Sequence, residues 1–220
     1  MTPESRKRWW LALAVVLSIG YAILAHASLV NGVSPTVGTL LSLAPISLFA
    51  LWSVRRSRHR ALGAAALALA AVAAWLGWGT LERHFPDIFF IEHATTNLLL
   101  AFIFGRTLAA GREPLVAIFA RLVHGSIPPE VERYARQVTL AWTVFFATLL
   151  TLSCALYFGK FLAAWSLLAN ILSPILVTAM FVLEYAVRLR ALPNWERVGI
   201  LGGVRAFTRH FATARFEAPR

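Results

Sequence analysis

The chain has 220 residues, of which 59% are hydrophobic and only 14% are charged. A soluble domain needs more charge than this to cover its surface, so the composition excludes an ordinary soluble globular protein. The net charge of +11 would suit a nucleic-acid-binding protein, but the position of the charges along the chain is better explained by membrane topology.

Apolar runs of about 20 residues, long enough to cross a ~30 Å hydrocarbon core, recur along the chain. Six runs are predicted to be transmembrane helices, at about residues 9–30, 35–54, 61–81, 88–108, 138–158 and 161–187. The expected fold class is therefore all-α: a polytopic membrane protein with a single transmembrane domain over residues 1–190 and a basic, interfacial tail at 191–220. The first run follows Arg6, Lys7 and Arg8 and resembles a signal peptide, but its length and the later spans favour an uncleaved helix.

The basic residues are distributed unevenly between the two sides of this predicted topology. With the N-terminus inside, 19 of the 21 Lys and Arg residues fall on the cytoplasmic side, and only Arg83 and Lys160 fall outside. Cytoplasmic connections retain positive residues, so both termini are predicted to be cytoplasmic. Membrane lipids with anionic headgroups are the expected partner of this charge, and nucleic acid is not.

The connection between the fourth and fifth runs is predicted to contain a short amphipathic helix on the membrane surface. One apolar stripe has helical spacing and consists of Leu115, Ile118, Phe119 and Leu122. Pro114 suits the first turn of this helix, and Gly125 can end it. A helix restarts near residue 129 and runs into the fifth span. The same region carries a candidate basic face made of Arg106, Arg112, Arg121, Arg133 and Arg136.

Polar residues interrupt two of the apolar runs and form a candidate intramembrane site. Successive helical residues are 100° apart, so one arc of the fourth run contains Glu92, His93, Thr96 and Asn97. Charge facing lipid is costly, so Glu92, His93 and Asn97 are predicted to face the bundle interior, near the first or sixth helix. His26 lies at a similar depth in the first helix, and Asn170 lies in the sixth, four residues before the helix-kinking Pro174.

Three interpretations of the cluster around Glu92 remain open. It can supply interhelical hydrogen bonds, handle protons or a ligand in a cavity, or bind a metal. A metal site is not expected, because no third ligand is identifiable. The sequence also lacks the common nucleophile, zinc-protease, P-loop and dinucleotide motifs, so it gives no positive support for an enzyme and leaves open only one with a dispersed membrane site. No cofactor is expected.

Residues 97–195 resemble a family of bacterial inner-membrane proteins. The resemblance is carried by Phe104-Gly105-Arg106-Thr107-Leu108, Gly111-Arg112-Glu113-Pro114-Leu115, Tyr134-x-Arg136-x-Val138-Thr139-x-x-Trp142-x-x-Phe145-Phe146, Trp165, Asn170 and Glu184-Tyr185-x-x-Arg188. In such families the gene lies beside those for acyl-carrier proteins, ligases and ketosynthases that build aryl-polyene or xanthomonadin-like pigments.

The resemblance implies a membrane component of such an acyl-chain pathway and assigns no reaction. The expected function is a non-catalytic accessory protein that anchors acyl-carrier protein or acyl-chain enzymes at the cytoplasmic face, or assists hand-off of the product. Two alternatives remain: a transporter or flippase-like subunit that exports the lipid-like product, and a membrane acyltransferase.

Overall fold

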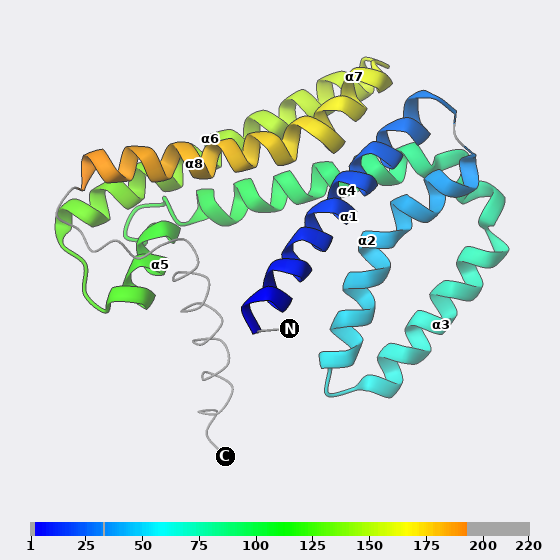
Figure 1. Cartoon of the computed structure of the whole chain (residues 1–220), viewed down its shortest axis with the longest axis horizontal. Helices are drawn as coiled ribbons and strands as arrows, with labels where there is room; N and C mark the ends of the chain where they lie inside the picture. The colour runs from blue at the N-terminus through cyan, green and yellow to red at the C-terminus, as the bar shows by residue number, and fades with distance from the viewer. Residues whose placement is uncertain (1–2, 33, 193–220) are drawn as a thin grey trace. The chain divides into compact units, whose positions relative to one another are not determined.

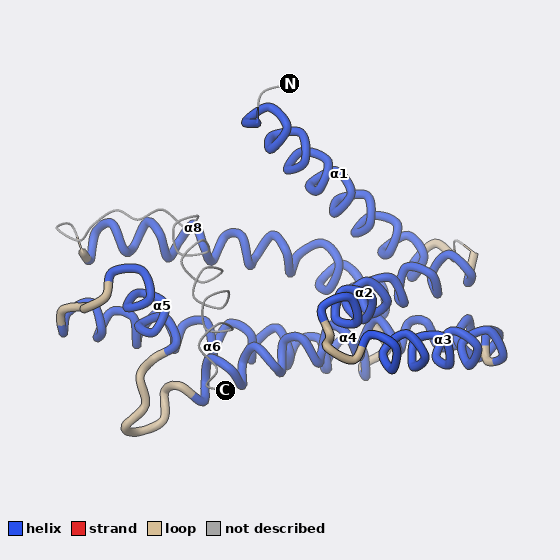
Figure 2. Tube along the Cα trace, turned by 90° about the horizontal axis from the view of Figure 1, so that it is seen from below, coloured by secondary structure: helices blue, strands red, loops and turns tan. Residues whose placement is uncertain are grey.

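Helices make up most of the residues that the structure describes. The computed structural model describes residues 3–32 and 34–192, and the predicted tail lies outside these residues from position 193 onward. No strand occurs in the two described ranges, which confirms the all-α class (Figure 2). The elements in chain order are α1 (Pro3–Val30), α2 (Pro35–Arg56), α3 (Arg60–Leu76), α4 (Trp78–Arg106), α5 (Leu115–His124), α6 (Pro129–Phe158), α7 (Leu162–Ser166), the π-helix η1 (Leu167–Leu172) and α8 (Ser173–Ala191) (Figure 1).

Five helical stretches among the described residues are long and apolar enough to cross a membrane. They are Arg8–Val30, Pro35–Arg56, Trp78–Arg106, Pro129–Phe158 and Leu162–Ala191, and they correspond to five of the six predicted spans. The remaining prediction, residues 61–81, corresponds to α3, which has 17 residues. At 1.5 Å per residue α3 is about 25 Å long, a little less than a ~30 Å hydrocarbon core.

The boundary between α3 and α4 lies earlier in the chain than predicted. Gly77 ends α3, with its N–H donating to the Ala73 carbonyl at 2.9 Å. The N–H groups of Thr80 and Leu81 then donate to the Gly77 carbonyl, so a new helix begins at once. Residues 82–87, predicted as a connection, are therefore helical, and Pro86 lies inside α4.

Glycine permits close packing of α3 against α2, which lie side by side in Figure 1. A methyl group on Gly63 would come within 2.8 Å of Val54 Cγ2. Because that separation is too short for two carbon atoms, only glycine fits here without a shift of the neighbouring helix.

The described chain divides into two compact units, each with its own core. Unit 1 comprises the residues up to Ala94 together with Leu152–Ile175, and unit 2 comprises Thr95–Thr151 and the residues from Leu176. The buried core of unit 1 consists of Ala25, Leu29, Phe85, Phe89 and Trp165. In unit 2 the rings of Trp142 and Phe146 stack with centroids 5.4 Å apart, and Val138 is buried with them.

A π-helix interrupts the last span immediately before a proline. In η1 the backbone N–H of Ser173 donates to the Leu168 carbonyl, five residues back. Pro174 follows and has no N–H, so it cannot donate to the carbonyl of Asn170 four residues earlier. A wider helical turn therefore ends just before Pro174, where the sequence predicts a kink. Such π turns occur frequently at functional sites.

Candidate functional site

The predicted polar residues are divided between the two units. Unit 1 contains His26, Glu92, His93 and Asn170. Thr96 and Asn97 belong to unit 2, where Asn97 is 5% exposed while Thr96 is on the open side of α4. Thr96, predicted as a member of the same polar arc, is thus exposed in unit 2.

His93 joins three helical segments of unit 1 through hydroxyl groups. Its Nδ1 lies 3.0 Å from Ser153 Oγ on α6, and its Nε2 lies 3.1 Å from Ser173 Oγ at the start of α8. Trp165 Nε1 on α7 donates to Ser153 Oγ at 2.9 Å, and Ser173 Oγ donates to the Leu168 carbonyl at 2.8 Å. These four bonds form a continuous chain.

The donor and the acceptor of each of these four hydrogen bonds can be assigned from the two ends of the network, the Trp165 N–H and the Leu168 carbonyl. Ser173 has one hydroxyl proton and gives it to Leu168, so it accepts from the Nε2–H of His93. Nδ1 of the neutral ring is then an acceptor, and the Ser153 hydroxyl donates to it while accepting from Trp165. Both ring nitrogens are thereby occupied by serines that are 0% and 8% exposed. This arrangement is that of an interhelical connection, one of the three interpretations of the sequence.

A second histidine makes a similar link between α1 and α7. His26 Nδ1 lies 2.9 Å from Ser166 Oγ, and Ser166 is fully buried. Asn170 Nδ2 donates to both the carbonyl and the Oγ of Ser166, each at 3.2 Å. His26 and Asn170, predicted from different helices, are therefore brought to the same serine.

Tyr21 compensates for a proline in the neighbouring helix. Pro45 lies inside α2 and has no N–H, so the Leu41 carbonyl loses its helical partner. The Tyr21 hydroxyl donates to that carbonyl at 3.3 Å. An unpaired carbonyl in hydrocarbon is costly, so this contact both ties α1 to α2 and satisfies the broken helix. Glu92, which is half-buried, lies close enough to Tyr21 for an electrostatic interaction.

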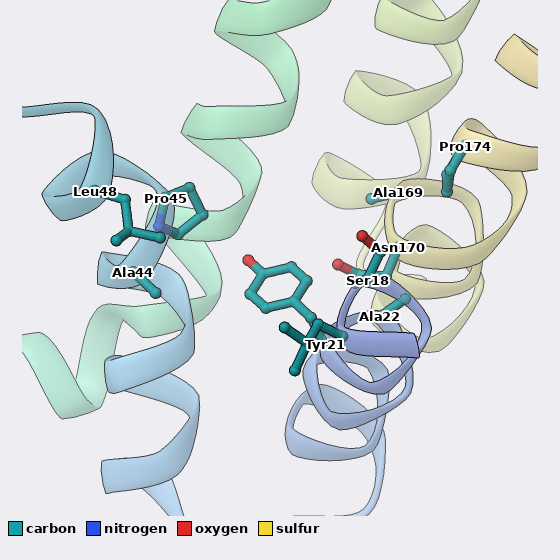
Figure 3. Close-up of a pocket in the computed structure, with 10 residues that line it drawn as sticks. Ser18, Tyr21, Ala22, Ala44, Pro45, Leu48, Ala169, Asn170 and Pro174 are labelled. Atoms are coloured by element: carbon teal, nitrogen blue, oxygen red, sulfur yellow. The ribbon is translucent and has the colours of Figure 1, made fainter. Parts of the chain in front are cut away.

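A groove of about 590 Å³ opens beside these residues in unit 1 (Figure 3). Most of its lining is apolar, and three polar side chains interrupt it. The lining residues are Leu17, Ser18, Tyr21, Ala22, Ala44, Pro45, Leu48, Ala169, Asn170 and Pro174. Tyr21 extends across the space toward α2, with Ser18 and Asn170 on its other side (Figure 3). Apolar walls with a few placed polar groups are typical of a site for a small molecule.

Sequence reasoning identified two members of the groove, Asn170 and Pro174, and missed Tyr21 and Ser18. The signal that could have found Tyr21 is Pro45, since a proline inside a predicted span leaves one carbonyl that must find a donor on another helix. The partner itself could not be identified without the packing of α1 on α2.

The predicted basic face lies in unit 2, and only part of it is free of acidic partners. Arg121 Nε lies 2.6 Å from Glu113 Oε1, and its Nη2 lies 3.2 Å from Glu132 Oε2. Arg136 Nη2 donates to the Leu108 carbonyl at 2.6 Å. All five arginines of this face are exposed. Arg121 links Glu113 to Glu132, so its charge is partly neutralised, whereas Arg106, Arg112 and Arg133 present exposed guanidinium groups.

The amphipathic helix α5 has the predicted bounds and is fixed at its N-terminus by two threonines. Thr107 Oγ1 accepts the Leu115 N–H at 3.1 Å, and Thr139 Oγ1 accepts the Val116 N–H at 3.3 Å. Gly125, with φ of 79°, ends the helix as predicted, whereas Pro114, predicted in the first turn, is the residue immediately before the helix. Farther along unit 2, Arg188 Nε lies 3.6 Å from Glu184 Oε1 and forms an ion pair with it.

No group of three or more metal-ligating side chains occurs among the described residues. Comparison of the chain with protein-family models, with curated proteins and with solved structures finds no match.

Proposed function

We propose that this protein is a non-catalytic accessory protein of the bacterial inner membrane that holds a lipid-like acyl-chain molecule and assists its hand-off. The observation that carries the proposal is the groove of unit 1, about 590 Å³ in volume and lined mainly by apolar side chains. Its residues belong to stretches long and apolar enough to cross a membrane, so an occupant would enter from the hydrocarbon.

The resemblance of residues 97–195 to proteins encoded beside acyl-carrier proteins and ketosynthases supports the chemical class of the occupant. An aryl-polyene or xanthomonadin-like product has a long apolar body, which suits apolar walls. The proposal includes six membrane crossings with both termini cytoplasmic, with α3 as the third crossing. That topology keeps 19 of the 21 basic residues on the cytoplasmic side.

A second function, a platform for soluble enzymes, is favoured by the exposed guanidinium groups of unit 2. Arg106, Arg112 and Arg133 are exposed near α5, and acyl-carrier proteins are generally acidic. Complementary charge would speed their encounter. Co-purification from membranes at low and high salt tests this function: replacement of the three arginines by glutamine should abolish salt-sensitive capture of carrier protein, and capture that persists would contradict it.

Export and acyl transfer are the two alternatives. A transporter would use the same groove as part of a route across the membrane. An acyltransferase would need an accessible base, and His93 has both ring nitrogens against buried serines. That geometry favours the holding function over acyl transfer at His93.

The holding function is tested in cells with a variant whose larger side chain fills the groove. Ala22→Phe places a ring in the groove from α1, and Ala12→Phe makes the same change at an exposed position of the same helix. We expect Ala22→Phe to lower the surface pigment of a complemented deletion strain while precursor synthesis continues, and Ala12→Phe to behave as the wild type. Normal pigment with a stable Ala22→Phe protein would overturn the proposal.

A further inference from the structure

We infer that the groove of unit 1 selects an amphiphile whose polar group is a neutral hydrogen-bond donor, that is, a hydroxyl-bearing lipid. This inference rests on the proposed function and adds the chemistry of the head group to it. It is carried by the hydrogen bonds of Ser18, Tyr21 and Asn170, the three polar side chains that line the groove.

The donors of these three residues are already used within the protein. The Tyr21 hydroxyl donates to the Leu41 carbonyl at 3.3 Å, and the Ser18 hydroxyl donates to the Ala14 carbonyl at 2.8 Å. The Nδ2 group of Asn170 donates to Ser166. Each hydroxyl has a single proton, so neither can donate to a ligand without giving up its present bond.

Acceptor capacity remains on the same residues. The oxygens of Ser18 and Tyr21 keep lone pairs, and Asn170 turns its Oδ1 away from the Ser166 contact that its Nδ2 makes. Figure 3 shows Ser18 and Asn170 beside each other, to the right of the Tyr21 ring.

The depth of the site makes this excess of free acceptors over free donors selective for a ligand that donates a hydrogen bond. Ser18 and Tyr21 follow Arg8, the start of the candidate span, by about 15–20 Å of helix, which is near the middle of the membrane. No water is available there to bond a ligand group left without a partner. An ester, ether or carboxylate would meet only other acceptors, whereas a hydroxyl would be satisfied.

A cationic head group is disfavoured by the same lining. Glu92 interacts electrostatically with Tyr21 but is not among the lining residues, so an ammonium in the groove would have no ion-pair partner in its lining. The remaining class is a neutral donor on an apolar chain. The apolar chain of a hydroxyl-bearing lipid fits the apolar walls, and its hydroxyl can donate to the oxygens of Ser18, Tyr21 or Asn170.

The test uses three photoreactive probes that differ only at the head: a diazirine-labelled medium-chain fatty alcohol, its methyl ether and the matching primary amine. Each competes for labelling of the full-length protein in nanodiscs, and labelled peptides are mapped by mass spectrometry. We expect the alcohol to label the groove helices with about fivefold higher affinity than the ether, the difference that one hydrogen bond makes.

Two variants separate head-group recognition from chain binding. Asn170→Leu removes Oδ1 and should reduce the alcohol-to-ether ratio to about two or less while ether labelling persists. Asn170 also contacts Ser166, so its replacement can disturb the packing. Ser18→Ala, at an exposed position, should also reduce the alcohol-to-ether ratio, with less structural change. Ala22→Phe should abolish labelling by the alcohol and the ether alike.

The outcomes distinguish this inference from the proposed function. Equal groove labelling by alcohol and ether, lost in Ala22→Phe, would overturn the donor preference and leave chain binding intact. Stronger labelling by the amine would also overturn the neutral hydroxyl assignment. Absence of groove labelling by any probe would contradict the proposed function itself.

Discussion

His93 is held by hydroxyl groups from two other helical segments, and this explains how an imidazole is accommodated within a span. Ser153 and Ser173 saturate its two ring nitrogens, and Trp165 and the Leu168 carbonyl complete the chain of bonds. Every donor in the chain therefore has an acceptor. The network stabilises unit 1 only as long as all its members are present.

Ser153→Ala tests this network. The change leaves His93 Nδ1 without its donor and Trp165 Nε1 without its acceptor. We expect a loss of about 1–3 kcal/mol in the free energy of unfolding in detergent. Thr151→Ala, on the same helix at an exposed position, should change it by less than about 0.5 kcal/mol. Equal effects of the two variants would show that the network contributes nothing specific.

Tyr21 and Pro45 form a pair whose coupling can be measured. Tyr21→Phe leaves the Leu41 carbonyl without a donor and should destabilise the protein by about 1 kcal/mol. In a Pro45→Ala background, the backbone N–H restored at position 45 can bond to the same carbonyl, so Tyr21→Phe should cost almost nothing. A double-mutant cycle by chemical unfolding measures the coupling; additive effects would contradict this role for Tyr21.

Among the secondary-structure elements, α5 is the clearest case of a helix anchored from outside. Pro114 offers no side-chain cap, and the first N–H groups instead bond to Thr107 and Thr139. Thr139 also donates to the Ala135 carbonyl, so one hydroxyl connects two turns of α6 and the start of α5. The position of α5 in unit 2 thus depends on this side chain.

Thr139→Val should loosen α5 without breaking α6. The acceptor for the Val116 N–H is lost, and helix caps of this kind are worth about 1 kcal/mol. Hydrogen exchange of α5 amides should become about fivefold faster. Thr143→Val is the matched control, because the Thr143 hydroxyl bonds only within α6, and exchange in α5 should stay unchanged. Unaltered exchange in Thr139→Val would refute the anchoring role.

Elements with local signals were predictable from the sequence. Pro114 and Gly125 indicated the two ends of α5, and the predicted restart of a helix near residue 129 corresponds to the start of α6. The end of α3 was predicted too late, because apolar residues continue past Gly77, the residue that ends the helix.

The candidate site was predictable only in part, for a physical reason. The cost of polar groups in hydrocarbon identified His26, His93 and Asn170. Their serine partners carry weak signals, since a serine can satisfy its own hydroxyl within a helix, as Ser18 does with Ala14. Which helices meet is decided by packing, and that information is absent from periodicity.

For the molecule as a whole, the central question is whether α3 crosses the membrane. Its length of about 25 Å is short for a span, yet without this crossing the connection after α2 and the start of α4 would lie on the same side. Arg55, Arg56 and Arg58 favour the cytoplasm for the connection after α2. A modestly thinned bilayer would accommodate the short helix.

Cysteine labelling tests the crossing. In a Cys154→Ser background, Ser57→Cys should react with an impermeant maleimide only from the cytoplasmic side, and Thr80→Cys only from outside, because α3 separates them. Lys160→Cys, in the short turn after α6, is the external control. Labelling of positions 57 and 80 from the same side would show that α3 does not cross.

The most direct test of the central claim, that the groove holds a lipid-like molecule, is native mass spectrometry of the protein released from its own membranes. The wild type and Ala12→Phe should retain a bound small amphiphile of defined mass. Ala22→Phe, folded to the same extent by thermal unfolding, should have lost that species. The same bound species in all three proteins, or none in the wild type, would contradict the claim.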